Sequence, residues 1–127
     1  MSRLAWVSSV SFLFTVPHSI EDFASGIAQR FGLSELTAGV SLGVVMAAQV
    51  WATAALGWKP RPARWLLLVN GLFWVIGALA DHLGDLFDPT WRSGLPSQAL
   101  VLGIIVSQAS VAALAGLELW DRRRALP

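Results

Sequence analysis

The stretch "LTAGVSLGVVMAAQVWATAALGW", residues 36–58, contains no charged residue. A helix needs about 20 predominantly apolar residues to cross the hydrocarbon core of a bilayer, which is about 30 Å thick. This stretch is therefore long enough and apolar enough to cross a membrane as a single helix. It decides the fold class, because an uncharged segment of this length is typical of a transmembrane helix.

Three further apolar segments extend this pattern along the chain, at 4–16, 65–80 and 99–117. The last is long enough by itself. The segment at 65–80 reaches the required length only if Asp81 and His82 lie at the membrane edge. The first does so only if its helix continues beyond Pro17 through His18 and Glu21, and transmembrane helices tolerate proline.

The composition agrees with a membrane protein. The chain is 55% hydrophobic and 13% charged, whereas soluble domains carry roughly 25% charged residues. We predict an all-α membrane protein: a single domain, 1–127, with four transmembrane helices in a bundle. A signal peptide is the alternative for the N-terminal segment, but Glu21 and Asp22 follow it directly and no A-x-A site is present. The absence of Cys excludes thiolate metal sites, and the net charge of +1 gives no reason to expect a nucleic-acid partner.

Basic residues set the expected orientation, because Lys and Arg are enriched in cytoplasmic loops. In a four-span arrangement Arg30 and Arg92 lie on one side. The other side carries Arg3, Lys59, Arg61, Arg64, Arg122, Arg123 and Arg124. We therefore expect an inner (plasma) membrane protein with both termini in the cytoplasm. The loops 18–35 and 81–98 then face outward, with Trp91 as an outer aromatic anchor.

The two halves of the chain show similarities that suggest a duplicated helical hairpin. His82 lies 64 positions after His18. "LGVV" at 42–45 corresponds to "LGII" at 102–105, and Gln49 corresponds to Gln108. Chance matches between apolar helices are the alternative, because such helices use few residue types.

Both histidines have acidic neighbours at helical spacing. Residues three and four apart share a helix face, so His18 projects with Glu21 and Asp22, and His82 with Asp85. Ionisable groups near a membrane are costly and tend to mark function. These five residues are the candidate catalytic residues. We expect His18 and His82 to face a common cavity that opens at the outer surface.

Several chemistries suit such a cluster. Imidazole and carboxylate ligands from two helices can bind a divalent metal. Without a metal, Glu21 could act as an acid that exchanges its proton with His18, while Asp22 meets water or Arg30. A haem held by both histidines is a weaker alternative. The structural alternative is that the acidic groups cap helices and pair with Arg30 or Arg92.

The motif "HSIED" at 18–22 resembles the signature of the HXXEE family of small bacterial membrane proteins. The later segments "VNGLFWVIGALADH" at 69–82 and "WRSGLPSQALVLG" at 91–103 are also similar to that family's pattern. The chain departs from the motif at Asp22, where the family has Glu. The resemblance singles out His18, Glu21 and Asp22 without implying a reaction. A looser likeness to emopamil-binding-type sterol isomerases offers an analogy for the chemistry alone.

Two classes of function follow from these observations. The first is a membrane enzyme that acts on a lipid or isoprenoid at the outer membrane edge by acid–base or metal-assisted chemistry. The second is a non-catalytic membrane subunit that binds a partner or small ligand. The bilayer is the expected surrounding in both cases, and a homo-oligomer is compatible with either.

Overall fold

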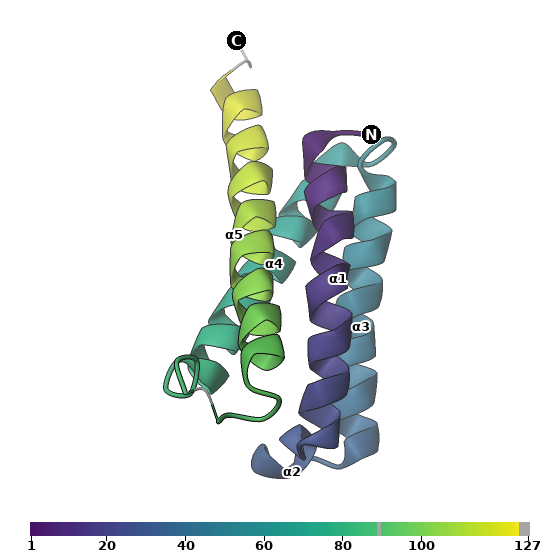
Figure 1. The fold of residues 1–127 in the computed structure, drawn as a ribbon. Helices are drawn as coiled ribbons and strands as arrows, with labels where there is room; N and C mark the ends of the chain where they lie inside the picture. Colours follow the sequence, from purple (N-terminus) through teal and green to yellow (C-terminus); the bar gives the residue numbers. More distant parts are fainter. Residues whose placement is uncertain (89, 125–127) are drawn as a thin grey trace.

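The computed structural model describes residues 1–88 and 90–124, with side chains described through residue 121. Every element in this part of the chain is an α-helix, which confirms the predicted all-α fold. Four helices are long, and the short helix α2 lies at one end of them (Figure 1). The basic side chains at 122–124, which contribute to the orientation prediction, lie outside the described part. In chain order the helices are α1 (Arg3–Ala24), α2 (Ile27–Arg30), α3 (Glu35–Ala55), α4 (Pro60–His82) and α5 (Leu95–Arg124).

Three helices, α3, α4 and α5, are long and apolar enough to cross a membrane. Helix α1 has 22 residues, a length of about 33 Å, but several of its side chains are polar. Its outward side is apolar, with Trp6, Leu13 and Ile20 exposed. Its inward side is mainly polar and includes the buried residues Ser8, Ser11, Thr15, His18 and Ser19. A fourth membrane span formed by α1 stays a prediction.

Helix α1 continues without a break through Pro17, as predicted. An interior proline removes one backbone hydrogen bond, and the neighbouring helices of a bundle can compensate for it. Because the helix continues, His18, Glu21 and Asp22 lie on its last two turns. The chain then turns at Gly26, whose φ of 77° lies in the left-handed region that favours glycine.

Polar side chains near the middle of the bundle form hydrogen bonds between helices. The Gln49 amide on α3 donates to Ser11 Oγ on α1 at 2.8 Å, and the Gln108 amide on α5 donates to Gln49 Oε1 at 3.1 Å. Asn70 on α4 donates to the backbone carbonyl of Val45 at 2.8 Å. One hydrogen bond between membrane helices contributes about 0.6 kcal/mol. These bonds join all four long helices.

Two glycines allow close packing against α5. A Cβ atom at Gly71 on α4 would lie 2.8 Å from the backbone oxygen of Gln108, so a larger residue would force α4 and α5 apart. A Cβ atom at Gly103 on α5 would overlap the ring of Phe14 on α1. The close packing of α1 and α4 against α5 thereby brings the C-terminal ends of α1 and α4 near one another.

The connections lie at two ends of the bundle, as the four-span arrangement requires. The start of α1 lies at the same end as the α3–α4 connection, and α2 lies at the opposite end with the α4–α5 connection (Figure 1). The orientation of these ends relative to a membrane stays a prediction. Helices α4 and α5 pack along much of their length, whereas α1 and α3 touch far less. The two hairpins therefore differ in packing, and the predicted repeat is not confirmed.

Candidate functional site

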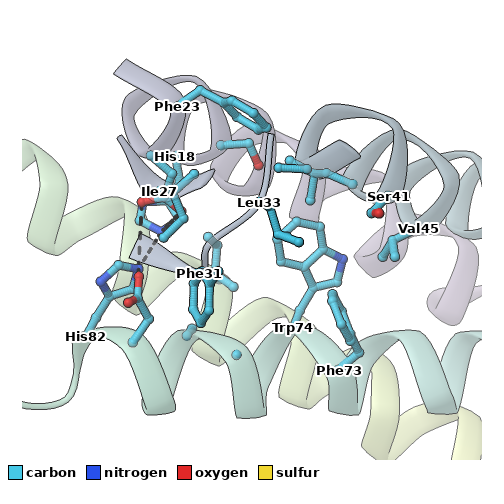
Figure 2. A pocket seen from close by; sticks show the side chains of 18 residues that line it. His18, Phe23, Ile27, Phe31, Leu33, Ser41, Val45, Phe73, Trp74 and His82 are labelled. Atoms are coloured by element: carbon cyan, nitrogen blue, oxygen red, sulfur yellow. Dashed lines mark hydrogen bonds and ion pairs between the residues drawn. The ribbon is translucent and has the colours of Figure 1, made fainter. Parts of the chain in front are cut away.

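The two histidines of the chain meet at the end of the bundle that carries α2. His18 comes from the C-terminal part of α1, and His82 is the last residue of α4. Their Nε2 atoms lie 3.0 Å apart, and the two residues are 3% and 2% exposed, respectively. Figure 2 shows the two rings pointing toward one another across the space between the helices, and their planes are 79° apart. Both rings line one cavity, which confirms the prediction that they share one.

Asp22 completes this pair from one helical turn beyond His18. One oxygen of its carboxylate lies 3.3 Å from His18 Nε2, and the other lies 3.9 Å from His82 Nε2. The second oxygen also accepts a hydrogen bond from Arg92, which reaches it from the α4–α5 connection. The nearby arginine is therefore Arg92 and not the expected Arg30, as in the structural alternative that pairs the acidic groups with Arg30 or Arg92. The expected contact of Asp22 with water stays a prediction.

The acidic neighbour of His82 is Asp81 and not the predicted Asp85. The prediction assumed that the helix continues past His82, but α4 ends there and the chain turns. Asp85 is exposed, and in the described part of the chain no hydrogen bond or ion pair joins its side chain to His82. Asp81 Oδ2 instead lies 3.2 Å from His82 Nε2. The same oxygen lies 3.2 Å from a guanidinium nitrogen of Arg30, so the predicted pairing of these acidic groups with arginine is confirmed for Asp81.

Glu21 is held by two hydroxyl groups, one from the α4–α5 connection and one from the first turn of α5. Its Oε1 atom accepts hydrogen bonds from Ser93 Oγ, at 2.8 Å, and from Ser97 Oγ. Its Oε2 atom is buried without a hydrogen-bond partner in the described structure, 3.9 Å from His18 Nδ1. An oxygen that accepts hydrogen bonds from two hydroxyl groups is in the position of a carboxylate acceptor. The role of Glu21 as a working acid stays a prediction.

The connection between α4 and α5 closes over the cluster. The Trp91 ring lies 5.0 Å from the His82 ring, and the Arg92 guanidinium lies 4.5 Å from the centre of the Trp91 ring. Trp91 is thus a partner of the histidine, and its role as an outer anchor stays a prediction. Thr90 donates from its backbone and its hydroxyl to Asp88 in the same connection, which lowers the pKa of Asp88 below its ordinary value.

An apolar cavity of about 450 Å³ extends from the cluster between α1, α2, α3 and α4. His18, Asp22, Asp81 and His82 form its polar end. Most of its remaining wall is aromatic or aliphatic, and Figure 2 shows the cavity together with the two histidines. Its margin is open, because Phe31 and Phe73 are 64% and 52% exposed. The wall includes Phe23, Phe31, Leu42, Val45, Phe73 and Trp74.

This arrangement allows two kinds of chemistry. Donor atoms of His18, Asp22 and His82 all lie within 4.8 Å of one another, and two imidazoles with one carboxylate suit zinc or non-haem iron. In the absence of a metal, one Nε2–H group donates a hydrogen bond and the other Nε2 atom accepts it. The direct contact between the rings leaves no room for a porphyrin between them, so the haem alternative does not fit this geometry.

Comparison with protein-family models, with curated proteins and with solved structures finds no match to this chain. The histidine and carboxylate cluster and the cavity that adjoins it are therefore the observations on which a function can be argued.

Proposed function

We propose that this protein is a small integral membrane protein that binds an amphiphilic lipid or isoprenoid at the outer edge of a bacterial inner membrane. In this proposal α1 is a fourth span, both termini are cytoplasmic, and α2 and the α4–α5 connection face outward. The three apolar helices support a multi-pass arrangement. The polar face of α1 packs inside the bundle and its apolar side faces outward, which suits a helix in contact with lipid.

The observation that carries this proposal is an apolar cavity that ends in buried titratable groups. Ligand sites are typically cavities of about 300–1,000 Å³ with mostly apolar walls and a few convergent polar groups. The cavity of about 450 Å³ meets this description, with His18, Asp22 and His82 at one end. An amphiphile would place its chain along the aromatic wall and its polar end against this cluster.

The reaction we propose is acid–base or metal-assisted chemistry at the polar end of that ligand. His18 and His82 present their Nε2 atoms to one another and to the carboxylate of Asp22. Burial keeps bulk water away from these atoms and strengthens their interactions with a ligand. Glu21 acts as a positioning residue through its contact with the Nδ1 side of His18. The resemblance to the HXXEE family concerns the same residues.

A direct test measures binding of a brominated long-chain alcohol, because bromine quenches the fluorescence of a nearby tryptophan. Trp74 lines the cavity and is 9% exposed. We expect quenching that saturates with the alcohol and that is much reduced in Trp74→Phe. Equal quenching of both proteins would show that the alcohol binds elsewhere, since the chain has six other tryptophans.

The second candidate is a non-catalytic binding protein. It is favoured by the ion pairs of the cluster, because Arg92 and Arg30 neutralise Asp22 and Asp81. Mass spectrometry of lipids incubated with the purified protein separates the two candidates. A converted lipid that appears with the native protein and not with His18→Ala supports the enzyme. A lipid that binds and is recovered unchanged supports the non-catalytic alternative.

A further inference from the structure

The distances within the cluster match those between the ligands of one metal ion. A tetrahedral zinc site with bonds of about 2.0–2.1 Å places neighbouring ligand atoms about 3.3 Å apart. The two Nε2 atoms are 3.0 Å apart, and Asp22 Oδ2 lies 3.3 Å from His18 Nε2. His82 Nε2 is farther from this carboxylate: it lies 3.9 Å from Oδ1, the oxygen that Arg92 binds, and one donor atom from each of the three residues lies within 4.8 Å of the others. Small side-chain rotations would bring all three donors to one ion.

Several buried polar atoms of the cluster have no hydrogen-bond partner in the described structure, and metal binding would explain how they are arranged. The Nδ1 atoms of His18 and His82 are buried, and neither has a hydrogen-bond partner in the described structure. A histidine that binds a metal through Nε2 carries its proton on Nδ1 and usually donates it to a carboxylate or carbonyl. Glu21 Oε2 lies 3.9 Å from His18 Nδ1 and is itself buried and unpaired. When His18 carries its proton on Nδ1, this nitrogen is a donor and Glu21 Oε2 is the acceptor nearby.

The surrounding charges leave one oxygen of the Asp22 carboxylate for an ion. Arg92 binds one oxygen of Asp22, while the other oxygen faces His18 Nε2. Asp81, the remaining carboxylate near His82, is shared with Arg30. Asp22 can therefore bind an ion through one oxygen while its second oxygen stays with Arg92.

We propose that His18, Asp22 and His82 bind one divalent ion, Zn²⁺ or Fe²⁺, through the two Nε2 atoms and a carboxylate oxygen. Glu21 is the positioning residue whose Oε2 accepts a hydrogen bond from the Nδ1–H group of His18. This inference deepens the proposed function and rests on it, because the free coordination position faces the cavity, where the polar end of the ligand lies. Three protein ligands and an open position are the arrangement of catalytic zinc sites, and two histidines with one carboxylate are that of non-haem iron sites.

The test is a titration of the purified, chelator-treated protein in detergent with Co²⁺, Zn²⁺ and, without oxygen, Fe²⁺. We expect one ion per chain and, for Co²⁺, the visible absorption bands of a low-coordinate site. Competition between Zn²⁺ and Fe²⁺ identifies the preferred ion. We expect His18→Ala, His82→Ala and the nearly isosteric Asp22→Asn to lose stoichiometric binding, and Glu21→Gln to weaken it about 10- to 100-fold. The matched control is Asp85→Asn, an exposed carboxylate just beyond α4, which should bind as the native protein does.

Two results would overturn the metal site. One is the absence of stoichiometric binding by the native protein, which needs no variant to interpret. The other is unchanged binding by Asp22→Asn and both histidine variants, with circular dichroism and thermal unfolding confirming that they fold. Quenching by the brominated alcohol, measured on the metal-free protein, tests the proposed lipid site separately. Quenching without metal binding would refute the metal site and leave the proposed lipid site in place.

Discussion

Filling the cavity without disturbing the fold should block ligand binding, and Gly77 is the position for this change. Gly77 lines the cavity in the interior of α4, and a Cβ atom built on it meets no heavy atom within 4 Å. Gly77→Leu therefore adds four carbon atoms where there is room for them. Replacing a glycine in a helix interior also favours the helix by about 0.8 kcal/mol. We expect the melting temperature to stay the same or rise.

The loss of affinity follows from the volume that the leucine takes from the ligand. Four displaced methylene groups, at about 0.8 kcal/mol each for transfer from water, correspond to at most about 3 kcal/mol. That is roughly a 200-fold weaker Kd. Detergent offers the displaced chain an apolar alternative, so we expect at least about a tenfold loss in the fluorescence-quenching assay.

The control is the same substitution at Gly43 on α3, which also has no heavy atom within 4 Å of a built Cβ. Gly43 lines a separate groove between α1 and α3 and not the cavity that contains the histidines. Gly43→Leu should bind the alcohol normally. Normal binding by Gly77→Leu would show that the ligand does not occupy the cavity. A loss of binding confined to Gly43→Leu would show that the ligand occupies the groove between α1 and α3 instead.

Three other predictions concern orientation, packing and the limits of the site. Cysteines introduced singly at the exposed positions Ser25 and Gly57 should differ in intact cells: an impermeant thiol reagent labels the first and not the second, and the reverse result would invert the proposed orientation. Gln49→Leu removes the bonds to Ser11 and Gln108 and should destabilise the bundle by about 1–2 kcal/mol, seen as a lower melting temperature; an unchanged value would show that the network does not support the fold. Asp85→Asn should leave ligand binding unchanged, and a loss of binding would show that Asp85 belongs to the site.

The helices could be predicted from the sequence because hydropathy and length are local properties. The uncharged residues 36–58 correspond to α3, and the first helix continues past Pro17 as the length argument requires. The kind of contact that polar side chains make inside the bundle could also be predicted. Gln49 and Asn70 lie in apolar segments, where polar side chains usually bond to a neighbouring helix, and both do so.

The acidic neighbours of the histidines could be predicted only where the helix continues. His18, Glu21 and Asp22 lie within α1, so their spacing describes their geometry correctly. The same spacing fails after His82, because the helix ends there. Ser97 was missed because it lies 76 residues from Glu21, the carboxylate that it contacts. Arg92 was named as a partner of the acidic groups in the structural alternative, but its pairing with Asp22, 70 residues away, was not singled out. No local pattern relates residues so far apart, and only the packing of α5 against α1 brings them together.

In the proposed function the cavity and the histidine cluster form one ligand site. Photocrosslinking with two long-chain alcohols tests this most directly, one with its diazirine beside the hydroxyl group and the other with it at the far end of the chain. We expect the first probe to label peptides containing His18, Asp22 or His82, and the second to label peptides containing Val45 or Phe73. Labelling by both probes outside these peptides, or with the two patterns exchanged, would show that the cavity and the cluster are not one ligand site.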